Sequence, residues 1–132
     1  MAKKEFLFHG KKLAELQAMS IKEFIVLLPS RERRSIERMF AQKDNSDMYK
    51  LYLKINAKKP KIRTHCREFV ILPEMVGTTI AVHNGTEFKD VIIVDKMLGH
   101  RLGEYVLTRV FLTHSTPGIG ASKSTKFVSV RA

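Results

Sequence analysis

The chain has 132 residues, of which 44% are hydrophobic, and it carries 24 Lys and Arg against 13 Asp and Glu, a net charge of +11. This length suits one compact body with extensions and excludes a large α/β barrel or a two-domain dehydrogenase. The positive charge predicts a polyanionic partner, and the single cysteine, Cys66, excludes an intrachain disulfide and a zinc site built from cysteine pairs. No apolar run reaches the ~18–20 residues of a membrane helix, and charges interrupt the N-terminal segment, so we expect neither a membrane span nor a secretory signal.

Basic residues concentrate in the first half of the chain. Residues 1–66 carry 16 Lys and Arg against 7 Asp and Glu, whereas residues 67–132 carry 8 against 6. Beyond Glu104 every charged side chain is basic. We therefore expect three parts: a basic helical N-terminal part over residues 1–60, a small α/β core over 61–112 and a basic C-terminal tail over 113–132.

Short helices are predicted in the N-terminal part. Ser20 and Glu23 form a capping box, in which the hydroxyl accepts a backbone N–H and the carboxylate reaches back, and Pro29 ends the helix that follows. Ser30 is expected to cap the next helix, and residues 44–46 separate that helix from a third. The apolar residues of these helices recur at helical spacing: Ile21, Phe24, Ile25 and Leu28, then Ile36, Met39 and Phe40, then Met48, Leu51, Tyr52 and Ile55.

Basic side chains occupy other faces of the second and third predicted helices. The second helix carries Arg31, Arg33, Arg34 and Arg38, and the third carries Lys50, Lys54 and Lys58 in a row at i, i+4 spacing. Like charges at this spacing cost a few tenths of a kcal/mol each unless an anion lies against them. The rows indicate either RNA contact or a solvated surface, and two basic helices in succession favour RNA contact.

The second half of the chain alternates β-rich runs with tight turns. An extended segment from residue 61 leads to an apolar run over 69–72, which reads as a buried strand or strand-like run, and residues 73–77 and 95–99 each suit one helical turn. Strands are predicted over 78–83 and 86–94, joined by a type I′ turn with positive φ at Asn84 and Gly85, and a third strand is possible over 104–113. The predicted fold class is α+β: N-terminal short helices followed by a small, mainly antiparallel β-sheet with an Asn-Gly hairpin and a basic C-terminal extension.

Catalytic motifs are weak in this sequence. His65 and Cys66 are adjacent, so on an extended chain their side chains point to opposite faces and do not easily form a nucleophile–base pair. The five histidines lack metal-ligand spacing, and residues 118–124 fail the P-loop pattern because Ser122 stands where a glycine must precede Lys123. The alternative interpretation is a small nucleic-acid-processing enzyme using histidine and acid chemistry. It would need converging carboxylates, and the sequence shows no such pairing, so we expect no enzyme, metal or cofactor.

The sequence also lacks the signatures of common RNA-binding modules, such as the RRM aromatic motif, the GXXG clamp and the zinc knuckle. Trp is absent, and most Phe residues lie in apolar patterns typical of a core. Base stacking is therefore not expected to dominate. Recognition of shape and phosphates by Arg and Lys is the better interpretation.

Four ordered segments are similar to the small-subunit ribosomal protein S19 family: Lys-Ile-Arg-Thr-His-Cys-Arg at 61–67, Ile-Leu-Pro-Glu-Met-Val-Gly at 71–77, Val-His-Asn-Gly at 82–85 and Met-Leu-Gly-His-Arg-Leu-Gly-Glu-Tyr at 97–105. The front of the chain and residues 114–121 resemble the archaeal and eukaryotic branch of that family, and the resemblance covers roughly residues 6–130. Two residues of the 84–91 region depart from the family pattern. Thr86 stands where the family usually has a basic residue and Asp90 where it commonly has proline, which weakens an RNA-gripping role for the outer edge of this turn.

The resemblance implies a structural, non-enzymatic constituent of the head of the small ribosomal subunit in the cytoplasm. It implies binding to the 3′ major domain of 16S-type rRNA next to ribosomal protein S13, with a C-terminal tail that reaches toward the decoding region and the A-site tRNA. It implies no cofactor, no membrane and no small-molecule substrate. The candidate rRNA-binding residues come from the basic rows, the similar segments and the tail: Arg31, Arg34, Arg38, Lys50, Lys54, Lys58, Lys61, Arg63, Thr64, His65, Arg67, His83, Asn84, His100, Arg101, Arg109, His114, Lys123, Lys126 and Arg131.

Overall fold

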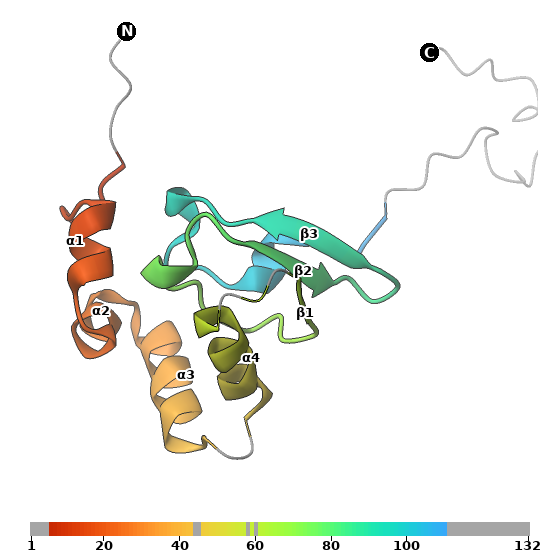
Figure 1. Ribbon diagram of the computed structural model, residues 1–132, viewed down its shortest axis with the longest axis horizontal. Coiled ribbons are helices and arrows are strands. Elements are labelled where there is room, and N and C mark those ends of the chain that lie inside the picture. Colours follow the sequence, from red (N-terminus) through yellow and green to blue (C-terminus); the bar gives the residue numbers. More distant parts are fainter. Residues whose placement is uncertain (1–5, 44–45, 58, 60, 111–132) are drawn as a thin grey trace, which may run out of the picture.

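The computed structural model describes residues 6–43, 46–57, 59 and 61–110. Four helices come first along the chain: α1 (Leu13–Ala18), α2 (Ile21–Leu27), α3 (Ser30–Ala41) and α4 (Asp47–Asn56). A three-stranded sheet follows, built from β1 (Ile62–Thr64), β2 (Thr79–His83) and β3 (Phe88–Ile92), together with the short 3-10 helices η1 (Pro73–Met75), η2 (Asp95–Met97) and η3 (Leu102–Tyr105). The predicted α+β class is confirmed, and Figure 1 shows the helices on one side of the sheet with α4 directly beneath it.

Helix α2 begins and ends as the sequence indicates. The Ser20 hydroxyl accepts the Glu23 backbone N–H at 3.4 Å, and the Glu23 carboxylate accepts the Ser20 N–H at 3.2 Å, which confirms the capping box. The prediction that Ser30 caps the next helix is wrong, because Pro29 holds the cap position and Ser30 is the first residue of α3. Proline fixes φ near a helix-compatible value, which favours the start of a helix. Helix α3 begins without a side-chain cap.

The sheet is mainly antiparallel, with one shorter parallel pairing. Its strand order is β1-β2-β3, with β1 parallel to β2 and β2 antiparallel to β3. Parallel neighbours need a crossover connection of about a dozen residues or more, and residues 65–78, which include η1, provide it. The register places Ile62, Ile80 and Val91 side by side on the buried face of the sheet.

Two predicted strands take other conformations. The run over 69–72 is completely buried, but its only described strand pairing is an isolated antiparallel bridge between Val70 and Arg101. The predicted strand over 104–113 is wrong in its described part: η3 ends at Tyr105 and residues 106–110 are in no strand, while residues 111–113 lie outside the described residues. The Glu104 carboxylate accepts the Arg101 backbone N–H, which closes a 3-10 turn where the strand was expected to begin.

Residues 84–87 connect the antiparallel strands β2 and β3, whose last cross-strand pair is His83 with Phe88. The predicted two-residue type I′ turn is wrong, since Gly85 has φ +114° but Asn84 has no positive φ. The Asn84 side-chain oxygen instead accepts the backbone N–H of Thr86 at 2.9 Å and of Glu87 at 2.7 Å. Asparagine therefore stabilises a longer turn through its side chain rather than through a left-handed backbone.

One hydrophobic cluster joins the helices to the sheet. It runs from Leu16 in α1 to Val106 after η3 and includes side chains from α2, α3, α4, β1, β2 and β3. Helix α4 packs against α3 and β1, and α1 packs against η1. The buried face of the sheet therefore rests on the helices, which leaves its opposite face to carry polar and basic side chains.

Candidate nucleic-acid interface

Alternation along the three strands places one set of side chains on the face of the sheet that points away from the helices. On β1 this is Arg63, with His65 directly after the strand; on β2 it includes His83, and on β3 it includes Phe88 and Ile92. Arg63, His65, Phe88 and Ile92 are exposed, and His83 is half-buried. This face is therefore available to a partner.

Three rings and one guanidinium meet at one end of this face, and we name them the ring patch: Arg63, His65, His83 and Phe88. The ring centroids of His65 and His83 lie 4.3 Å apart, and the Phe88 centroid lies 5.1 Å from that of His65 and 4.9 Å from that of His83. The Arg63 Cζ atom lies 5.6 Å from the Phe88 centroid, within cation–π range. The structure thus brings together three predicted contact residues from two separate segments.

Phe88 is the member of the ring patch that sequence reasoning missed. Most Phe residues lie in apolar patterns typical of a core, and the sequence did not single out Phe88 as a contact residue, yet Phe88 is 37% exposed. The signal that could have identified Phe88 was its position next to the predicted turn. Phe88 pairs with His83 across the turn, and a residue that faces an imidazole on the outer side of a hairpin is not a core residue.

A backbone contact orients the His83 ring. Its Nδ1 atom accepts the Gly85 backbone N–H at 3.1 Å. A ring nitrogen that accepts a hydrogen bond carries no proton, so in a neutral His83 the N–H group is at Nε2. The turn therefore fixes which hydrogen-bonding atom His83 presents to a partner.

Arg67 lies inside the framework rather than in the interface. Its guanidinium donates to three backbone carbonyl oxygens: that of His83 at 2.7 Å, of Gly103 at 2.9 Å and of Val106 at 2.6 Å. These bonds connect the end of β2 to η3 and to the segment after it. These bonds give Arg67 a structural role, and its rRNA contact stays a prediction.

Three further candidates are also engaged internally. Arg101 is 13% exposed and bridges to α3, where its guanidinium lies 3.6 Å from the Glu32 carboxylate and donates to the Ser35 hydroxyl at 3.3 Å. Thr64 is buried and its hydroxyl oxygen accepts the Cys66 backbone N–H at 3.0 Å. Asn84 is buried and holds the turn described above. These contacts position the outer face without reaching it.

The remaining described candidates lie at the surface. Arg31, Arg34 and Arg38 share one exposed face of α3, and Lys50 and Lys54 are exposed on α4, where Lys50 pairs with Asp47 at 3.2 Å. Lys61 and Arg109 are exposed as well, and the exposed His100 contacts the Glu104 carboxylate through Nδ1 at 2.8 Å. The candidates outside the described residues are Lys58, His114, Lys123, Lys126 and Arg131.

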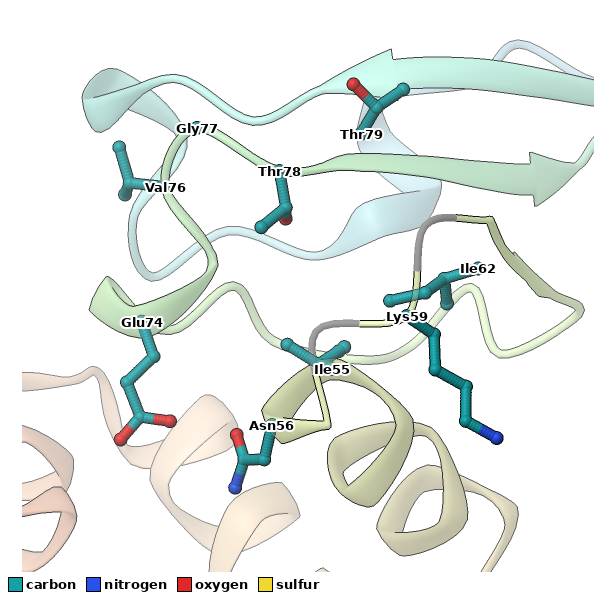
Figure 2. Close-up of a pocket in the computed structure, with 9 residues that line it drawn as sticks. All are labelled: Ile55, Asn56, Lys59, Ile62, Glu74, Val76, Gly77, Thr78 and Thr79. Atoms are coloured by element: carbon teal, nitrogen blue, oxygen red, sulfur yellow. The ribbon is translucent and has the colours of Figure 1, made fainter.

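One cavity in the described part of the chain lies between the end of α4 and the start of β2. It measures about 760 Å³ and is lined by Ile55, Asn56, Lys59, Ile62, Glu74, Val76, Gly77, Thr78 and Thr79. Figure 2 shows Glu74 and Lys59 on opposite sides of this opening. Glu74 and Lys59 are the charged residues of this lining, and Asn56, Thr78 and Thr79 are its uncharged polar ones.

Within the described residues, no cluster of three or more His, Cys, Asp or Glu side chains has the arrangement of a metal site. The helices among them include none of the length and apolarity needed to cross a membrane.

A family model described as Ribosomal protein S19 matches residues 34–114, which is more than half of the chain. The matched segment begins within α3 and includes α4, the whole sheet, the ring patch and η3. Residues 6–33 and 115–132 lie outside it, so the similarity of those parts to the archaeal and eukaryotic branch stays a prediction.

Proposed function

The chain belongs to the ribosomal protein S19 family, and from this membership we propose that it occupies the head of the small ribosomal subunit in the cytoplasm. There it binds the 3′ major domain of 16S-type rRNA beside ribosomal protein S13, and residues 113–132 reach toward the A-site tRNA. Family membership itself makes the chain an rRNA-binding, structural constituent of the small subunit. The proposal concerns where it binds and which side chains carry the contact.

The observation that carries the proposed binding mode is the arginine row of α3. Arg31, Arg34 and Arg38 are exposed on one face, whereas Ile36 and Met39 of the same helix are buried in the hydrophobic cluster. An exposed row of guanidinium groups fits a line of backbone phosphates, because each can donate two hydrogen bonds to one phosphate. We assign one set of phosphate contacts to this row of arginines.

A second set of exposed cations lies at β1, after η3 and on α4. Lys61 and Arg63 are exposed at β1, Arg109 is exposed after η3, and Lys50 and Lys54 extend the basic surface along α4. These side chains carry charge but no base-reading geometry, so they position RNA without selecting its sequence. Arg67 and Arg101 bond to other parts of the fold and so stabilise the elements that carry these basic surfaces.

Salt titration of binding to small-subunit rRNA tests this assignment. Neutralising the row with Arg31→Gln, Arg34→Gln and Arg38→Gln together should weaken binding and flatten the plot of log K against log salt by roughly 2–3 units, since each lost phosphate contact removes about 0.7–0.9. The matched control removes the same charge elsewhere with Lys22→Gln, Lys89→Gln and Lys96→Gln, all exposed and none a candidate contact. Equal flattening in the control would show that net charge, and not this row, governs binding.

A further inference from the structure

Phe88 stands apart from the other exposed hydrophobic residues. Among the large hydrophobic side chains exposed in the described part of the chain it is the aromatic one, and the rest are Leu, Val or Ile. Burying a Phe side chain stabilises a fold by about 1.5–3 kcal/mol relative to leaving it exposed. At 37% exposure Phe88 gives up part of this gain, and it does so beside three groups that also attract π systems.

The ring patch is held in a fixed shape. The two imidazoles are inclined by 37°, close to stacked, while the Phe88 ring stands at 78° to His65 and 68° to His83. Cross-strand pairing fixes Phe88 opposite His83, and the Gly85 N–H fixes the His83 ring. Because these rings are already ordered, a ligand that stacks on them loses little affinity to ordering them.

The cations beside the patch favour RNA over an apolar protein surface, and the exposed Asp90 lies further along the same face of β3. Arg63 lies over Phe88, and the exposed Lys61 comes just before β1. An apolar protein surface would strip water from the Arg63 guanidinium without replacing its hydrogen bonds, which is costly. A nucleotide instead brings a flat base for the rings and a phosphate for the cation.

We propose that the ring patch is a stacking site for one unpaired RNA base, with Arg63 holding the adjacent phosphate and the His83 Nε2 atom within the site as a hydrogen-bond donor. The inference rests on the proposed rRNA binding and adds base recognition to a contact otherwise made to phosphates. Stacking tolerates any base, because every base has a π face. The site therefore selects an unpaired nucleotide over a paired one rather than a particular sequence.

The test uses the full chain and a single-stranded hexauridylate RNA in which one base is replaced by 2-aminopurine, whose fluorescence falls when it stacks and which uridine neighbours leave largely unstacked. Phe88→Leu keeps an apolar side chain but removes the π face. It should lower the affinity about 5- to 100-fold and abolish the fluorescence decrease, while leaving the salt slope unchanged because the phosphate contacts remain. Phe88→Tyr should retain the wild-type affinity.

Ile92→Ala is the matched control, because Ile92 lies on the same face of β3 and is 65% exposed. It should change the affinity less than twofold. Should Phe88→Leu lower the melting temperature, His65→Ala serves as a second variant, since it removes a ring that follows β1 and is itself exposed.

Three results would overturn the stacking site: wild-type affinity in Phe88→Leu, an equal loss in Ile92→Ala, or no binding of the hexanucleotide by the wild-type chain at a salt concentration where rRNA binds. All three leave salt-dependent rRNA binding intact. Failure of the proposed function is distinct, because the wild-type chain would then show no salt-dependent binding to small-subunit rRNA at all.

Discussion

Replacing Arg67 with methionine separates a structural arginine from an RNA-binding one. Methionine keeps a long apolar stem but has no N–H groups, so Arg67→Met removes all three hydrogen bonds to the carbonyl oxygens of His83, Gly103 and Val106. Gly103 and Val106 come after the buried Leu102 in the chain, and His83 is the last residue of β2. The variant therefore loosens η3 from the sheet.

The loss follows from the number of bonds and their exposure. A hydrogen bond to a charged group contributes about 1.5–3 kcal/mol net, so three would total roughly 4.5–9 kcal/mol if they were additive. Arg67 is half-buried, and water can hydrate part of what the variant releases. We expect the free energy of unfolding to fall by about 3 kcal/mol, a large part of the roughly 5–15 kcal/mol typical of a domain.

Urea denaturation measures this loss, and Arg34→Met is the matched control. Arg34 is exposed on α3, so the same substitution there should change the free energy of unfolding by no more than about 0.5 kcal/mol. The reasoning is refuted if Arg67→Met unfolds at the wild-type urea midpoint but binds rRNA more weakly. Arg67 would then be the RNA contact that the sequence suggested.

Three further predictions concern the turn between β2 and β3, the close contact between Gly103 of η3 and Arg67, and stability at alkaline pH. Gly85→Val should lower the free energy of unfolding by at least about 1 kcal/mol, because φ is +114° there, and a loss of rRNA binding without any change in the urea midpoint would contradict it. Gly103→Ala should destabilise by about 1–3 kcal/mol in the same assay, since its Cβ would lie 3.0 Å from both the Cβ and the carbonyl oxygen of Arg67. Burial, with a smaller contribution from Glu104, raises the pKa of Tyr105 above its usual value of 10.0. The stability that Tyr105 contributes is therefore complete below about pH 10 and is lost as pH rises through the folded-state pKa, so Tyr105→Phe should flatten the fall in melting temperature between about pH 9 and pH 11.

Helices α2, α3 and α4 could be predicted from the sequence because their signals are local, whereas α1 was not identified. The Ser20–Glu23 capping box lies within four consecutive residues, and the apolar spacing of α2, α3 and α4 is visible in the chain itself. The strands were harder to predict from the sequence. The run over 69–72 has the composition of a strand, yet its backbone hydrogen-bonds to residues 99–102 through a single bridge outside the three-stranded sheet.

The interface was predictable in composition but not in geometry. Arg63, His65 and His83 were named from the sequence, whereas their meeting with Phe88 depends on a parallel pairing that no local pattern reveals. The sequence predicts a positive φ at Asn84 in a two-residue turn, whereas its side-chain oxygen stabilises the turn by accepting a backbone hydrogen bond. Long-range contacts of this kind follow from the packed fold, and the sequence gives only the residue types that take part.

Adjacent arginines show why positive charge alone overstates the number of phosphate contacts. Arg33 and Arg34 are neighbours in α3 and look equivalent in the sequence. The Arg33 guanidinium donates to the carbonyl oxygens of Val26 and Leu28 at 2.9 and 3.1 Å and so stabilises the end of α2, whereas Arg34 is exposed. Consecutive helical residues point about 100° apart, so one can reach backward into the fold while the next faces solvent. Stability and salt slope therefore distinguish the two kinds of arginine: loss of an inward one lowers the urea midpoint, and loss of an outward one lowers the number of phosphates that the protein neutralises.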